Sequence, residues 1–255
     1  FAAYKFLIAY GQYFSILKLV CFFYGVIMCP LVYMMIDGIA VICLSFTITL
    51  SKPREGLGSE RPTSSLLGPA TFFSVLGVQI INLVFIAIGF AMMHSEADYV
   101  RWPAHLAEGA SWWLLGDNWE TTVIYMLVFS GFITTSCTFS FGSHYRASIS
   151  SNPAVLLSTF VLATVLVLTL LLPASRFTML WHIASEPFNN DCPTNSVWIR
   201  WQASGGRQSP GMSLAFRLKL LALMAAQAVC LVLWERCVVQ GPVREFLKKR
   251  FPSKR

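Results

Sequence analysis

The chain has 255 residues, of which 56% are apolar and only 12% are charged, and its mean hydropathy is +0.62. Soluble domains carry roughly half apolar and a quarter charged residues. This composition excludes an ordinary soluble enzyme and indicates a protein that is embedded in a lipid bilayer.

Helices that cross a bilayer need about 20 mainly apolar residues, because the hydrocarbon core is about 30 Å thick. Six stretches reach this length, and each is bounded by charge, proline or a polar cluster. They lack the alternation of apolar and polar residues that is typical of barrel strands. Lipid also cannot form hydrogen bonds with the backbone N–H and C=O groups at an open strand edge. We therefore predict an all-α membrane protein with spans at 4–24, 30–50, 69–93, 120–141, 154–173 and 214–234.

The loops between these spans are asymmetric in charge. The side that holds both termini carries twelve Lys and Arg residues, whereas the opposite side carries six. The positive-inside rule therefore predicts that both termini are cytosolic and that the long loops 94–119 and 174–213 are lumenal. The predicted parts are a first hairpin (1–50), a cytosolic loop (51–68), a supporting four-helix bundle (69–234) and a basic cytosolic tail (235–255).

The net charge of +7 is concentrated in this tail and in the cytosolic loops. Cations that follow a span directly are attracted to anionic lipids, so we expect the tail to contact membrane lipids and expect no nucleic-acid partner. The chain begins at Phe1, without a basic segment or cleavage site before the first apolar run. We expect no signal peptide and interpret the chain as part of a longer protein.

Residues of the usual catalytic and metal-binding types do not form recognisable motifs. Six of the seven cysteines lie in or beside apolar spans, no CxxC pair occurs, and the four histidines are scattered over both sides. The phosphate-binding pattern GxxxxGK[ST] is also absent. We therefore predict no metal site, no disulfide framework and no catalytic residues in this chain.

Only two charged residues, Lys18 and Asp37, fall clearly within the predicted spans, away from the span ends. A charge at mid-helix costs at least about 2.5–3.5 kcal/mol, so such residues are usually paired or functional. They lie at similar distances from the turn of the first hairpin and could form an intramembrane ion pair. Alternatively, Asp37 forms a polar path for a cationic substrate together with Tyr10, Gln12 and Tyr33, which is the hypothesis we favour.

Other polar residues within the spans are explained by contacts between helices. Gln79 and Asn82 lie three residues apart on one face of the third span, and Gln227 lies within the sixth. Amide side chains in membrane helices commonly form interhelical hydrogen bonds. We expect these three residues to stabilise the bundle rather than to bind a ligand.

Several strings resemble the C-terminal membrane half of type V P-type ATPases, particularly the polyamine-transporting type VB subgroup. They are YKFLIAYGQYFSILKL, YMMIDGIAV and SKPREGLGSERPTSSLLGP in the first 70 residues, then DNWETTVIY at 117–125 and FSFGSHYR at 139–146. The residues that match the family's motifs are Lys5, Tyr10, Ile36, Asp37, Arg61, Pro62, Ser65 and Leu66, with Glu235 closing the last span.

The resemblance implies that the chain supplies spans five to ten of a ten-span transport core. The family's phosphorylation motif DKTGT and its nucleotide-binding domain do not occur here. ATP, Mg²⁺ and the missing N-terminal half are thus expected only in the full-length protein. By analogy the pump would move polyamines from the lumen of an endolysosomal or vacuolar compartment to the cytosol.

The resemblance also assigns candidate substrate-binding residues. Tyr10 and Asp37 match pathway positions, Tyr33 occupies an aromatic-favouring position, and the family's glutamine aligns nearer to Phe14 than to Gln12. Lys18 departs from the family, because a fixed cation repels a polyamine unless it is neutralised or extends to the interface.

Three alternatives remain open from the sequence. The first is a pump for an inorganic cation or protons, in which Lys18 serves as a built-in counter-cation. The second is a helix dislocase of the type VA subgroup. The third, in a different class, is a truncated, non-catalytic membrane protein.

Overall fold

The computed structural model describes residues 2–56, 68–106, 116, 118–142, 146–173, 175–184, 203–207, 210–243 and 245–246. The motif residues Arg61, Pro62, Ser65 and Leu66 lie outside the described residues. The same is true of parts of the two predicted lumenal loops and of residues 244 and 247–255 of the basic tail.

The described residues include six helices that are long and apolar enough to cross a membrane. The prediction of an all-α membrane protein is therefore confirmed. These helices are α1 (Ala2–Tyr24), the second span α2–η1–α3 (Pro30–Tyr33, Met34–Val41 and Ile42–Thr49), α4 (Pro69–His94), α5 (Trp119–Phe139), α6 (Pro153–Leu171) and α9 (Leu214–Leu233) with its continuation η5 (Trp234–Val243). Short helices η2 (Ala104–Leu106), η4 (Ile149–Ser151) and α7 (Arg176–Leu180) lie in the connections.

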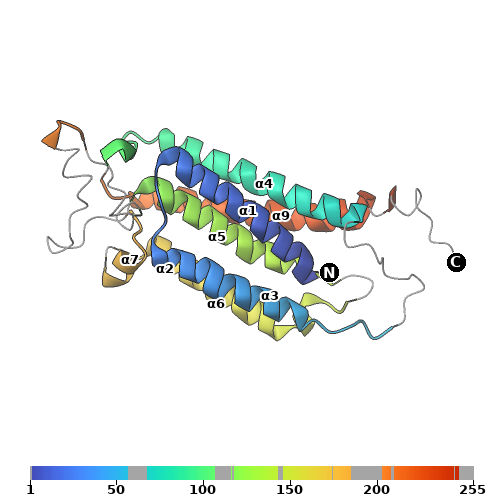
Figure 1. Cartoon of the computed structure of the whole chain (residues 1–255). Helices are drawn as coiled ribbons and strands as arrows, with labels where there is room; N and C mark the ends of the chain where they lie inside the picture. Colours follow the sequence, from blue (N-terminus) through green and yellow to red (C-terminus); the bar gives the residue numbers. More distant parts are fainter. Residues whose placement is uncertain are drawn as a thin grey trace.

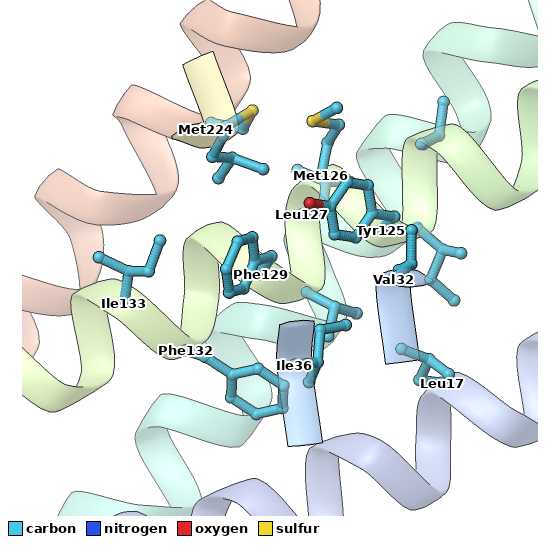
Figure 2. Close-up of a cluster of buried hydrophobic side chains, with 14 of the residues drawn as sticks. Leu17, Val32, Ile36, Tyr125, Met126, Leu127, Phe129, Phe132, Ile133 and Met224 are labelled. Atoms are coloured by element: carbon cyan, nitrogen blue, oxygen red, sulfur yellow. The ribbon is translucent and has the colours of Figure 1, made fainter. Parts of the chain in front are cut away.

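Helix α5 is the centre of the bundle, and nearly all of its residues are buried. It packs against α1, α4, α6 and α9, while the second span lies between α1 and α6 (Figure 1). Figure 2 shows Phe129, Phe132 and Ile133 of α5 within the apolar core, with Met224 of α9 nearby. A helix buried on all sides by other helices supplies the framework that fixes the positions of its neighbours.

Local signals in the sequence explain where several spans begin. Proline, which is favoured in the first turn of a helix, opens the second span, α4 and α6. The side chains of Asn118, Asn152 and Ser213 accept hydrogen bonds from the backbone at the start of α5, α6 and α9. Such caps satisfy N–H groups that would otherwise lack a partner.

Helix α1 and the second span are joined by a tight turn at Gly25, where φ is +66°. The amide of Val26 donates to the carbonyl of Cys21 at 2.9 Å, which ends α1. A Cβ atom at position 25 would collide with Ala104. Glycine is thus required both by the left-handed backbone and by the close approach of the loop after α4.

The two ends of the bundle differ in which helices begin and end there. Helix α1 begins and η5 ends at one end, which we call the terminal end (Figure 1). At the other, the loop end, α1 and α4 end and α5 begins.

Candidate functional site

Asp37 lies in η1, a π-helical segment in the middle of the second span, and its side chain is half-buried. The hydroxyl of Tyr10 in α1 donates a hydrogen bond of 2.6 Å to its carboxylate. π-Helical segments inside α-helices occur frequently at functional sites. The structure therefore brings together Asp37 and Tyr10, two of the residues that the sequence predicted as substrate-binding.

Aromatic rings extend from this carboxylate along α1. The ring of Tyr10 stacks against Phe14 with centroids 5.6 Å apart, and Phe14 meets the edge of Tyr33 at 5.9 Å. On the side of the supporting helices, Tyr10 contacts Phe132 of α5 at 5.4 Å. We call Tyr10, Phe14 and Tyr33 the aromatic row. It places three of the predicted residues beside Asp37 and presents ring faces that attract cations.

The ion pair expected as one possibility between Lys18 and Asp37 does not form in the structure, where both residues are described. The ammonium of Lys18 lies instead over the ring of Phe14, 4.8 Å from its centroid. Lys18 is four residues after Phe14 on α1, so the two share a helix face. The carboxylate of Asp37 is directed to the neutral hydroxyl of Tyr10 instead.

Gln12 is not part of this group. Its side chain is exposed, and within the described residues it forms no hydrogen bond with Asp37 or with the aromatic row. Two residues along a helix correspond to a rotation of about 200°, so Gln12 points away from the face that carries Tyr10.

A polar cluster supports the site from within the bundle. The amide nitrogen of Gln227 donates to the side-chain oxygen of Asn82 at 3.0 Å and to the carbonyl of Leu127 at 3.2 Å. The hydroxyl of Tyr13 donates to the same carbonyl at 3.2 Å, and its ring meets the edge of Phe132 at 5.3 Å. The expected interhelical role of Asn82 and Gln227 is confirmed, as is that of Gln79, which donates to the carbonyl of Ala9.

A buried charged pair at the terminal end was not predicted. The ammonium of Lys5 lies 3.0 Å from the carboxylate of Glu235, and the hydroxyl of Ser74 donates to that carboxylate at 2.6 Å. Glu235 lies within η5, so the helix does not end at 234 as the predicted span did. Its neutralisation by Lys5 explains why a carboxylate is tolerated in the continuing helix. The ring of Phe139, 4.3 Å from the ammonium, completes the contact.

At the loop end the motif DNWETTVIY, which opens α5, has a structural role. The carboxylate of Glu120, which is buried, accepts hydrogen bonds from the hydroxyl of Tyr99 at 2.7 Å and from the amide of Trp102 at 2.9 Å. Burial and the adjacent Glu120 carboxylate raise the pKa of Tyr99 above its usual value, so its hydroxyl stays protonated and can donate. These bonds attach the loop after α4 to α5.

The chemistry of the site follows from its components. A half-buried carboxylate and adjacent ring faces can bind an organic ammonium group by charge and by cation–π attraction. In the part of the chain that the structure describes, no group of three or more His, Cys, Asp or Glu residues could hold a metal ion. The fold and the site thus define a multi-pass helical membrane protein with a carboxylate and aromatic site in its first hairpin.

Comparison with known proteins gives distant relatives of one kind. The chain is 24% identical over 209 residues to the polyamine-transporting ATPase 13A3 of Macaca fascicularis, and 23% identical over 209 residues to that of Homo sapiens. The protein of the same name from Mus musculus is 24% identical over 206 residues. Each match covers 74% of this chain, which spans only 17% of the length of these curated relatives. No family model matches the sequence. The similarity supports the interpretation of the chain as a membrane part of a P-type ATPase.

Proposed function

We propose that this chain is the C-terminal membrane part of an ATP-driven pump that moves polyamines from the lumen of an organelle to the cytosol. The observation that carries the proposal is the hydrogen bond between Tyr10 and Asp37 beside the aromatic row. Distant similarity to polyamine-transporting ATPases points to the same ligand chemistry.

The substrate is proposed to bind as a polycation. One ammonium group would bind the carboxylate of Asp37, with Tyr10 holding that carboxylate in place. Neighbouring ammonium groups would lie on the aromatic row, where ring faces attract cations while the intervening alkyl segments contact apolar surface. A polyamine, with several ammonium groups joined by short alkyl chains, suits this alternation.

The remaining parts of the pump would cover the open side of the hairpin. Gly11 and Gly38 have no atom within 4 Å of the position that a Cβ would take. Nearby Leu19 and Met34 are 68% and 64% exposed. Open glycines on membrane helices allow a further helix to approach closely. We propose that helices of the N-terminal half of the pump pack here, that ATP and Mg²⁺ bind in its soluble domains, and that the terminal end faces the cytosol of an endolysosomal or vacuolar membrane.

The direct test is transport by the full-length protein that contains this chain. Vesicles with the reconstituted protein should accumulate or release labelled spermine only when ATP and Mg²⁺ are present. Asp37→Asn should abolish this transport, and Gln12→Ala, on the opposite face of α1, should leave it unchanged. If spermine does not move while inorganic cations do, the polyamine proposal is wrong. If no ATP-dependent transport occurs, and the coding sequence before Phe1 lacks a phosphorylation motif, the pump proposal is wrong as a whole.

A further inference from the structure

The candidate site already contains a cation that belongs to the chain itself. The Nζ atom of Lys18 lies 4.8 Å from the centroid of the Phe14 ring. An ammonium group within about 6 Å of a ring centroid is attracted by the negative face of the ring. Phe14 is the middle member of the aromatic row, between Tyr10 and Tyr33. The space above Phe14 is thus a place that an ammonium group can occupy.

Lys18 differs from the other two lysines in the described membrane helices, Lys5 and Lys219. Lys5 and Lys219 each form an ion pair, with Glu235 and Glu96 respectively. Lys18 pairs with no carboxylate among the described residues, and its side chain is exposed. The contact with Phe14 is therefore reversible, because no counter-charge holds the ammonium over the ring.

The position of Lys18 along α1 places it on the loop-end side of the carboxylate. It follows Tyr10 by eight residues, which corresponds to about 12 Å along the helix toward the loop end. A ligand that enters from the loop end meets Lys18 before it reaches Asp37. The positively charged Lys18 ammonium then repels a ligand that is itself positively charged.

We propose that the face of Phe14 is an ammonium subsite for polyvalent amines and that Lys18 is a tethered competitor for it. This inference rests on the proposed function of Asp37 and Tyr10. One ammonium of the ligand binds Asp37, and the next displaces the Lys18 ammonium from Phe14. A monoamine needs only Asp37 and leaves Lys18 in place. Lys18 thus sets how strongly the site distinguishes polyvalent from monovalent amines.

The test uses the full-length protein in lipid vesicles and measures amine-stimulated dephosphorylation of the phosphoenzyme. Lys18→Met should lower the half-maximal concentration of spermine about two- to fivefold, the range that corresponds to a weak cation–π contact. It should change that of butylamine much less. Lys18→Arg keeps a cation over the ring and should resemble the wild type. Lys219→Met removes an exposed charge near the loop end and controls for the overall electrostatic field.

A double-mutant cycle connects the effect to Phe14. Phe14→Leu removes the ring and should raise the half-maximal spermine concentration, and Lys18→Met should then give no further gain. Equal phosphoenzyme levels verify that the variants fold. The inference is wrong if Lys18→Met acts like Lys219→Met, affects both amines equally, or keeps its full effect in the Phe14→Leu protein. If the spermine response is lost in Asp37→Asn but unchanged in Lys18→Met, the inference about Lys18 is wrong and the proposed function still stands. A wild type that responds to no amine removes the proposed function as well.

Discussion

The buried pair of Lys5 and Glu235 offers a quantitative test of the packing between α1 and η5. The two side chains are only 15% and 5% exposed, respectively. Glu235→Gln keeps the shape of the side chain but leaves the Lys5 ammonium without a counter-charge. Removing one partner of a buried pair costs about 3–5 kcal/mol. Because Lys5 lies at the end of the bundle and retains some exposure, we expect the lower limit, about 3 kcal/mol.

Lys5→Met should cost about as much, since it leaves the Glu235 carboxylate with only Ser74 as a hydrogen-bond donor. The double variant removes both charges and should cost no more than either single variant. The free energy of unfolding can be measured by titration with denaturing detergent in mixed micelles, followed by tryptophan fluorescence. Lys52→Met, at an exposed lysine of the same end, is the matched control. Additive single effects, or a Lys5 variant as stable as the control, would refute the reasoning.

Three further predictions concern the bundle. Gln227→Leu removes a hydrogen-bond donor from the Asn82 side-chain oxygen and from the Leu127 carbonyl, and should lower the free energy of unfolding by about 1–3 kcal/mol. The control Val229→Ala, on an exposed face of α9, should lower it much less. Gly131→Ala should destabilise the same protein, because its Cβ would lie 2.9 Å from the Tyr13 ring and 3.1 Å from the Asn82 oxygen. Gly56→Ala, whose Cβ would have no atom within 4 Å, should change the stability much less. Glu120→Ala should speed hydrogen exchange of the Trp102 amide, and Glu96→Ala, which breaks an exposed pair, should not. Equal behaviour of a variant and its control would contradict the corresponding prediction.

The spans were predictable because their signal is local. Composition over about 20 residues and the prolines at positions 30, 69 and 153 place helices within a few residues of where the structure has them. The last span is the exception, because it continues past Glu235 until the backbone leaves the helical conformation at Gly241. The Glu235 carboxylate in this extension is paired with Lys5, which lies 230 residues away in sequence.

The site was predictable only in part, because some of its contacts join residues that are far apart in the sequence. Asp37 stood out as a charge within an apolar span, and the turn at Gly25 placed it near α1. The contact between Phe132 of α5 and Tyr10 was not predictable, because hydrophobic residues are common in every span. The π-helical form of η1 also carries no periodic signal in a segment that is almost uniformly apolar.

The position of Lys18 shows where reasoning from depth alone is insufficient. Similar depth in a hairpin allowed an ion pair with Asp37, but rotation about α1 decides which face each side chain occupies. Lys18 shares its face with Phe14, and the carboxylate is instead bound by Tyr10.

The central claim is that Asp37 binds an ammonium group of the transported molecule. It is tested most directly by forming the phosphoenzyme of the full-length protein from labelled ATP and measuring its decay with and without spermine. Spermine should accelerate dephosphorylation in the wild type and have no effect in Asp37→Asn, while phosphoenzyme formation itself is preserved. An undiminished response to spermine in Asp37→Asn, or a wild type that responds only to inorganic cations or pH, would contradict the account.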